Sequence, residues 1–206
     1  MLTIWGRMNS TNVQKVIWVC EELGLTYDRI DVGGPFGGLD DPVYRAKNPN
    51  GLIPTIEDDG FVLWESHAIL KYLAAGDPAR RLLPSGRRQT AEVDKWMDWQ
   101  MVTLGLSLRT LFMLMFGPAA GQSKPEDIVS ASSRVASVLA IIDRHLKTSA
   151  YVGGEAFTIA DIPVAISVHR WLNLPIERPS LASLEAWYAN VCSRPAFRKI
   201  RAVPIP

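Results

Sequence analysis

The sequence predicts a protein in two parts, an α/β half followed by an all-helical half. Short β-type runs alternate with helical periodicity over about the first 75 residues. The stretch "AGDPARRLLPSGRR", rich in Gly, Pro and charge, then interrupts this pattern. From Gln89 onward there are long helical patterns and no convincing strand. We therefore expect one domain over residues 1–77 and a second, all-α domain over residues 87–206.

The elements of the first half follow in a regular order. "LTIW" predicts a strand, and "GRMNST" separates it from a helix over Asn12–Gly24 whose apolar residues repeat every 3.6 positions and include Cys20, expected to be buried. "TYDRIDV" alternates like a strand, "GGPFGGLDD" is expected to be a flexible loop and "DPVYRAKN" a short helix. "PTIE" and "FVLW" predict a hairpin through "DDG", and "ESHAIL" opens another helix. The order βαβαββα predicts a four-stranded mixed sheet.

The second half is expected to consist of helices without an internal repeat, over about 87–116, 125–147, 158–172 and 181–192. In "FTIADIPV", Thr158 and Asp161 have the spacing of a capping box with Asp in place of Glu. Phe157 and Ile162 stand in the positions of a hydrophobic staple. We expect this motif to be structural, and loss of the Thr158 cap to cost about 1 kcal/mol.

Composition limits the classes of partner. The chain has 206 residues, of which 48% are hydrophobic, which is enough for one large core or two small ones. Its 22 basic and 21 acidic residues are interspersed, so no electrostatic footprint for nucleic acid or an anionic membrane is expected. The N-terminus lacks a signal-peptide pattern, and no run approaches about 18 uninterrupted apolar residues. A cytoplasmic protein with a small-molecule or protein partner fits best.

Several common enzyme signatures are missing from the sequence. Cys20 and Cys192 lie far apart without a CxxC spacing, and the three histidines show no metal-ligand spacing. There is no Gly-rich phosphate loop and no GxSxG motif. No metal site is therefore expected.

The stretch "WESHAIL" allows two interpretations. Ser66 could cap the helix while Glu65 lies near the positive end of its dipole, and from these residues alone this is favoured. Alternatively, the free N–H groups and the Ser66 hydroxyl receive a carboxylate while Glu65 accepts an ammonium. Together they would bind the zwitterionic end of an amino acid.

The proline of "LIPT" also allows two interpretations. Pro54 lies at the entry of a strand, where it is either an ordinary trans strand start, favoured by base rate, or a cis residue that turns the Ile53 backbone outward. An exposed Ile53 backbone could pair with an extended peptide as an extra strand.

The motifs "NPNGLIPTIEDDGFVLWESHAILKYL" and "FTIADIPV" resemble the cytosolic glutathione S-transferase superfamily, in particular its bacterial, serine/asparagine-type, theta- or nu-like members. The resemblance covers essentially the whole chain. It implies an N-terminal thioredoxin-like domain, an all-α C-terminal domain and a homodimer. It also implies that Glu65 and Ser66 hold the γ-glutamyl end of glutathione and that Ile53 pairs with the cysteinyl unit ahead of cis-Pro54. His67 has no matching role and is expected on the helix surface.

Catalysis by this family requires the glutathione thiol to become a thiolate. A free thiol has a pKa near 8.5, and lowering it by about two units takes roughly 2.7 kcal/mol. A hydrogen bond to a charged group supplies about 1.5–3 kcal/mol and a helix N-terminus about 0.3–1 kcal/mol, so no general base is required. "MNSTNVQKV" offers Ser10, Thr11 and Asn12 at a helix start, where at least one is expected to act as the N-cap.

The resemblance ranks these donors as Ser10 first, Asn12 second and Thr11 third, without deciding between Ser10 and Asn12. No cysteine or tyrosine occupies this corner, which disfavours the cysteine- and tyrosine-type classes. Leu52 stands where many relatives carry a Lys, Arg or Gln that reaches the glycyl carboxylate. That contact then comes from another residue, such as Arg7, Tyr44 or Lys47, or the affinity for glutathione is weak.

The expected function is conjugation of glutathione, as substrate, to small hydrophobic electrophiles whose identity the sequence does not reveal. Arg109, Met113 and Phe116 in "RTLFMLMF" are the candidates for the electrophile pocket, unless they serve core or dimer-interface packing instead. Three competing hypotheses for the function are a non-catalytic module that binds glutathione or a protein, a glutathione-dependent peroxidase or disulfide reductase, and an isomerase.

Overall fold

The computed structural model describes residues 1–203, which fall into two compact units. The first unit contains Met1–Leu83 together with the segment that begins at Pro195, and the second contains Pro84–Arg194. Phe197 fixes the C-terminal segment to the first unit, because its ring packs on Trp18 with a centroid distance of 4.8 Å. The domain limits at residues 77 and 87 stay a prediction.

The first unit has the predicted βαβαββα order around a four-stranded mixed sheet with strand order β2-β1-β3-β4. β1 is parallel to β2 and antiparallel to β3, and β3 is antiparallel to β4. The loop expected to be flexible contains a 3₁₀ turn over Gly34–Phe36. The elements are β1 (Leu2–Trp5), α1 (Thr11–Leu23), β2 (Tyr27–Ile30), α2 (Pro42–Lys47), β3 (Thr55–Asp58), β4 (Phe61–Trp64), α3 (Ser66–Ala75), a 3₁₀ turn (Pro195–Phe197) and α9 (Arg198–Arg201).

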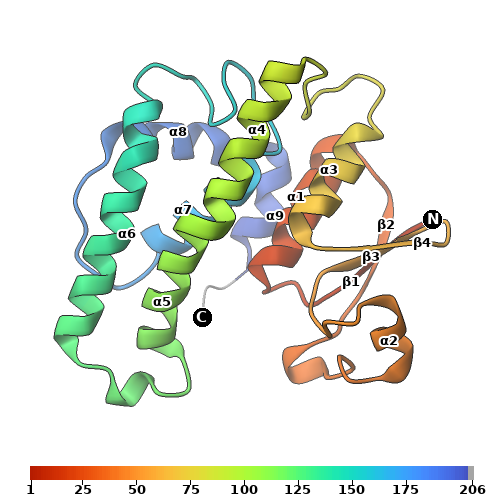
Figure 1. The fold of residues 1–206 in the computed structure, drawn as a ribbon, viewed down its shortest axis with the longest axis horizontal. Helices are drawn as coiled ribbons and strands as arrows, with labels where there is room; N and C mark the ends of the chain where they lie inside the picture. Colours follow the sequence, from red (N-terminus) through yellow and green to blue (C-terminus); the bar gives the residue numbers. More distant parts are fainter. Residues whose placement is uncertain (204–206) are drawn as a thin grey trace. The chain divides into compact units, whose positions relative to one another are not determined.

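Helices α1 and α3 pack side by side on one face of this sheet (Figure 1). Both carry apolar residues at helical spacing, and Ile4 and Ile56 at the centre of the sheet are fully buried. α1 ends at the expected glycine, since Gly24 takes the left-handed conformation with φ 69°. Cys20 is fully buried, as predicted, and burial raises the pKa of its thiol to about 12.

The register of the strands decides which loops come together. Trp5, at the end of β1, pairs with Thr55 at the start of β3, and Thr55 pairs with Trp64 at the end of β4. Leu2 and Asp58 pair at the opposite end of the sheet. The chain after β1, before β3 and after β4 therefore lies at one and the same end of the sheet.

The second unit is helical, and within residues 84–194 it contains only an isolated bridge between Tyr151 and Gly154 in place of a strand. The predicted helix over 87–116 is interrupted by a π-helical turn at Gln100–Leu104. Arg87–Phe116 has the length and hydropathy of a membrane span, a weak criterion that core helices of soluble proteins also meet. The helices are α4 (Arg87–Trp99), α5 (Gly105–Phe116), α6 (Pro125–His145), α7 (Asp161–Leu172) and α8 (Ala182–Cys192).

Helix α7 is the central helix of this unit, with every residue from Asp161 to Val168 buried. It begins at Asp161 and not at Thr158, because the residues between them form a turn closed by a 3.0 Å bond from Asp161 N–H to Thr158 C=O. The Asp161 carboxylate accepts hydrogen bonds from the backbone N–H groups of Thr158 and Val152, both at 2.8 Å, and from Trp187 Nε1 at 3.0 Å. Burial raises the pKa of Asp161 to about 6. The bond to Thr158 N–H is one half of the predicted capping box.

Candidate functional site

The residues singled out in the first half of the sequence gather at one end of the sheet. Ser10, Thr11 and Asn12 lie where β1 leads into α1, Ile53–Pro54 precedes β3, and Glu65–Ser66 joins β4 to α3. We call residues 6–12 the β1–α1 corner. Loops at one end of a sheet are a common place for binding groups, because rigid strands position them.

At the β1–α1 corner, Ser10 is the N-cap residue of α1, with φ −83° and ψ 123°. Its C=O accepts the first helical bond, from Gln14 N–H at 2.9 Å. Ser10 is thus the N-cap residue expected among the three polar residues, although within residues 1–203 no side-chain hydrogen bond caps α1. The Ser10 hydroxyl therefore lies at the positive end of the helix dipole and makes no cap bond to the described residues.

The peptide bond between Ile53 and Pro54 is cis, so of the two interpretations of "LIPT" the cis one is confirmed. Among the described residues, the N–H and C=O of Ile53 make no hydrogen bond. The neighbouring Leu52 C=O, in contrast, accepts bonds from Tyr44 OH at 2.7 Å and Asn48 Nδ2 at 2.9 Å. This fixes the chain ahead of Ile53 and leaves the Ile53 backbone available to an extended ligand.

The structure narrows the choice of residue that could replace the basic contact at Leu52, whose side chain is 62% exposed. Tyr44 is buried and its hydroxyl is already bonded. Lys47 forms an ion pair with Glu57. Arg7 donates to Asn9 at 2.7 Å and lies against Gly34, where an added Cβ would be 2.8 Å from Arg7 Nε. Within the described chain, Arg7 is thus the candidate whose charge is not paired with a carboxylate.

The first turn of α3 is also open. Glu65 is the N-cap residue, with the left-handed φ of 73°, and its C=O accepts from Ile69 N–H at 2.9 Å. No side chain in residues 1–203 caps this helix, so the expected Ser66 cap is not formed, whereas Glu65 lies at the positive end of the helix dipole as expected. Ser66 is buried in the first turn and Glu65 is exposed. Free N–H groups beside a carboxylate fit the interpretation as a binding site.

His67 is not on the helix surface, contrary to expectation. It is 8% exposed, and its Nε2 lies 3.2 Å from Nζ of Lys15 on α1. The reason is tertiary: α3 packs against α1, so the side chain after Ser66 is enclosed between the helices. One sequence signal could have indicated this burial. Lys15 stands in an apolar run, where its side chain has no exposed helix face to occupy.

The three residues predicted for the electrophile pocket lie on α5 at spacings of four and three. Arg109 is exposed, and Met113 and Phe116 are 43% and 41% exposed. On the other side of the helix, the leucines at positions 108 and 111 are buried. Sequence inspection missed Arg170 of α7, whose guanidinium lies 3.5 Å from the ring centroid of Phe112.

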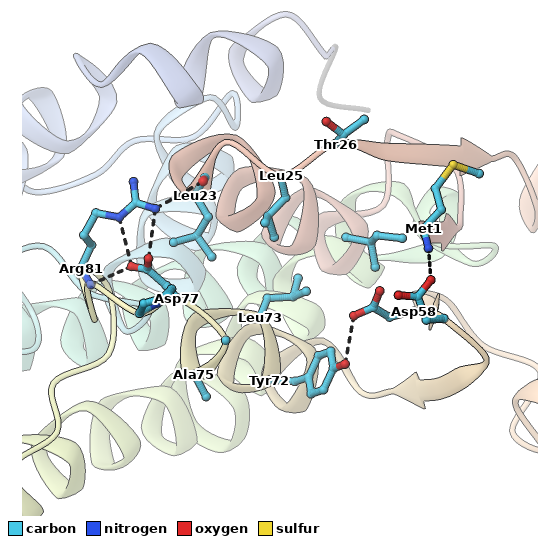
Figure 2. Close-up of a pocket in the computed structure, with 14 residues that line it drawn as sticks. Met1, Leu23, Leu25, Thr26, Asp58, Tyr72, Leu73, Ala75, Asp77 and Arg81 are labelled. Carbon is cyan, nitrogen blue, oxygen red and sulfur yellow. Dashed lines mark hydrogen bonds and ion pairs between the residues drawn. The ribbon is translucent and has the colours of Figure 1, made fainter.

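A groove of about 770 Å³ lies at the opposite end of the sheet in the first unit, next to the N-terminus (Figure 2). Its charged groups are bonded to one another: the Met1 amine to Asp59, and Arg81 to Asp77 at 3.0 Å. Because these charged groups are paired with one another, they do not point together at a ligand. In the part of the chain that the structure describes, no group of three or more His, Cys, Asp or Glu could hold a metal ion.

Comparison with known proteins identifies the family. Family models for the glutathione S-transferase N-terminal and C-terminal domains match residues 9–75 and 106–195. The curated glutathione S-transferase GstB of Escherichia coli (strain K12) is 35% identical over 207 residues, with 100% of both chains covered. The chain belongs to the glutathione S-transferase family.

Solved glutathione S-transferase structures agree with the fold. The theta-class enzyme from Xanthomonas axonopodis pv. citri with glutathione bound has a TM-score of 0.93 at 41% identity, covering 100% of this chain and 99% of that one. A glutathione S-transferase from Pseudomonas fluorescens has a TM-score of 0.84 at 27% identity, with 99% and 98% covered. The predicted fold, thioredoxin-like and then all-helical, is confirmed.

Proposed function

We propose that the protein conjugates reduced glutathione to hydrophobic electrophiles through a stabilised thiolate. The observation that carries the proposal is the convergence, at one end of the sheet, of two uncapped helix N-termini and a free extended backbone at a cis-proline. Family membership supports it, as does the similar theta-class structure that holds glutathione. The relatives are named as transferases, which favours conjugation over a binding module, a peroxidase, a reductase or an isomerase.

The amino-terminal end of glutathione is assigned to the first turn of α3. Its carboxylate accepts from the open N–H groups and the Ser66 hydroxyl, and its ammonium donates to Glu65. The cysteinyl unit pairs with the N–H and C=O of Ile53, ahead of Pro54. Leu52 supplies no charge for the glycyl carboxylate, and we assign that contact to Arg7.

The glutathione thiolate is assigned to the β1–α1 corner. Ser10 is the main hydrogen-bond donor, Asn12 the second and Thr11 the third, all at the positive end of α1. One donor to a charged sulfur contributes about 1.5–3 kcal/mol, which lowers the thiol pKa by about one to two units. The corner therefore produces the nucleophile without a general base or a metal.

The electrophile is assigned to the exposed side of α5, with Met113 and Phe116 as apolar contacts and Arg109 as a polar one. Met adapts to ligands of different shape, which suits a broad substrate range. We further propose that the enzyme is a cytoplasmic homodimer, as is typical of the family.

A spectroscopic titration of bound glutathione tests the role of Ser10. The wild-type protein should show a thiol pKa about one to two units below the value near 8.5 of a free thiol. Ser10→Ala should raise that pKa and lower kcat/KM, whereas Ser66→Ala should mainly raise KM for glutathione. If Ser10→Ala kept full activity at slightly acid pH while Asn12→Ala did not, the two roles would have to be exchanged.

Retention on immobilised glutathione, measured together with conjugation of a chloronitrobenzene, separates the enzyme from a binding module. Both should be observed. Retention without turnover would refute the catalytic assignment, and an unshifted thiol pKa would do the same.

A further inference from the structure

Two ionisable side chains meet inside the first unit, where apolar ones would be expected. Lys15 of α1 is 6% exposed and His67 of α3 is 8% exposed, and their nitrogens lie 3.2 Å apart. An ammonium has only donors, so in the charged form Lys15 donates to His67 Nε2. The hydrogen bond thereby joins the two helices whose first turns carry the proposed glutathione contacts.

This arrangement is unfavourable for stability taken alone. Burial lowers the pKa of Lys15 to about 7, against an attraction to the Glu65 carboxylate that raises it. Replacing buried ionic groups by apolar residues of similar volume is often neutral or stabilising. Packing therefore does not explain why a lysine stands at this position. A role in fixing the relative positions of α1 and α3 does explain it.

The positions of the two residues indicate what is fixed. Lys15 lies one helical turn beyond Thr11 and Asn12, on the same side of α1. His67 directly follows Ser66, and two residues before it Glu65 holds a left-handed backbone conformation with φ 73°. A non-glycine residue keeps such a conformation only where its surroundings hold it.

We propose that the Lys15–His67 hydrogen bond is a positioning element that holds the Glu65–Ser66 turn in register with the β1–α1 corner, so that one glutathione molecule reaches both. This inference rests on the proposed function. The two residues touch no substrate. They act through Glu65 and Ser66, so their loss should weaken glutathione binding without altering the thiolate donor.

The test compares variants that remove or keep the acceptor. His67→Leu and Lys15→Met should each raise KM for glutathione about tenfold, equivalent to about 1.4 kcal/mol. The kcat at saturating glutathione and the pKa of the bound thiol should stay close to wild type. His67→Gln places an amide oxygen near the position of Nε2 and should restore most of the affinity, whereas the shorter His67→Asn should not.

Two controls separate positioning from stability. Lys124→Met removes an exposed lysine of the second unit and should leave KM unchanged. Leu73→Ala creates a cavity at the far end of α3 and should lower Tm without changing KM. Should His67→Leu fail to fold, the comparison of His67→Gln with His67→Asn still decides.

The outcomes are distinct. A raised KM with rescue by His67→Gln supports the inference. A lowered Tm with unchanged KM, or equal effects of His67→Gln and His67→Asn, overturns it while leaving the proposed function intact. If the wild-type protein neither binds nor conjugates glutathione, the proposed function fails, and the inference with it.

Discussion

The N-terminus of α7 and those of α1 and α3 use their polar groups in opposite ways. At α7, Asp161 is fully buried and accepts bonds from two backbone N–H groups, an indole and a hydroxyl. At α1 and α3, no side chain of the described residues caps the helix, and Ser10 and Glu65 occupy the N-cap positions without side-chain cap bonds. We call the α7 terminus closed because Asp161 is bonded within the fold, although no side chain of the described residues caps α7 itself, and we call the termini of α1 and α3 open.

The difference separates stability from function. At the closed terminus, Asp161 satisfies donors of the preceding loop and of α8 and thereby stabilises the fold. An open terminus keeps N–H groups and a dipole for a ligand, at the expense of the stability that a cap would add. Substitutions at the closed terminus should therefore change unfolding, and those at the open termini should change glutathione binding or chemistry.

The largest expected effect is at the closed terminus. Asp161→Ala leaves the N–H groups of Val152 and Thr158 and the Trp187 indole without their acceptor, so the free energy of unfolding should fall by about 3–5 kcal/mol. Urea unfolding measures it, with the exposed Glu155→Ala as control, which should stay within about 0.5 kcal/mol of wild type. A loss below about 1 kcal/mol would remove the contrast between the termini.

The pH dependence of the free energy of unfolding tests the burial of Asp161 in a second way. Burial raises the pKa of Asp161 to about 6 in the folded state, against about 3.9 in the unfolded chain. The folded protein therefore favours the protonated form, and this contribution is present below pH 4 and lost as the pH rises through 6. Two units of pKa correspond to about 3 kcal/mol.

Asp161→Asn stays neutral and should not show this loss. The free energy of unfolding of the wild type, relative to Asp161→Asn, should decrease between pH 4 and pH 6.5. Equilibrium unfolding at a series of pH values measures the difference. A constant difference over this range would show that Asp161 is ionised as easily in the folded as in the unfolded state.

Sequence pattern predicted what depends on local structure. The alternation in "LTIW" and the "DDG" turn gave the strands, the 3.6 period gave the helices, and the family motif pointed to the cis bond at Pro54. The βαβ unit and the hairpin also indicate that β1 neighbours β2 and β3 neighbours β4, but not the long-range pairing of β1 with β3. The predicted features depend on residues close together in the chain, whereas the pairing of β1 with β3 does not.

What the pattern missed depends on packing between distant elements. His67 is buried because α3 packs on α1. The sequence between the two helices contains no pattern that predicts this contact. Tyr44 and Asn48 hold the Leu52 carbonyl, a three-dimensional arrangement that no spacing rule encodes. Ser10 takes the expected N-cap position but makes no side-chain cap bond, and the expected Ser66 cap is absent from the described residues, since a residue type favoured at a cap also serves as a ligand contact.

The open terminus of α3 should become more stable when its strain is relieved. Glu65→Gly removes the cost of a left-handed conformation at a non-glycine residue, offset in part by the greater freedom of glycine in the unfolded chain, for a net gain of about 1 kcal/mol. Binding of glutathione should weaken at the same time, because the carboxylate is lost.

Glu65→Gln is the matched control. It keeps the strained backbone and removes only the charge, so the affinity for glutathione should fall without a gain in stability. Thermal unfolding and the KM for glutathione measure the two effects. If Glu65→Gly destabilised the protein, the first turn of α3 would belong with the closed terminus of α7.

The smallest expected effect on stability is at the open terminus of α1. Replacing a serine that caps a helix by alanine typically costs about 1 kcal/mol. The Ser10 hydroxyl makes no cap bond, so Ser10→Ala should change the free energy of unfolding by less than about 0.5 kcal/mol. Urea unfolding without glutathione measures this value, and a loss near 1 kcal/mol would mean that the hydroxyl caps α1 in solution. Because the proposed role of Ser10 is exerted only on a bound sulfur, the same variant should lose part of the stabilisation that saturating glutathione gives the wild type, and the loss should increase with pH as the bound thiol ionises.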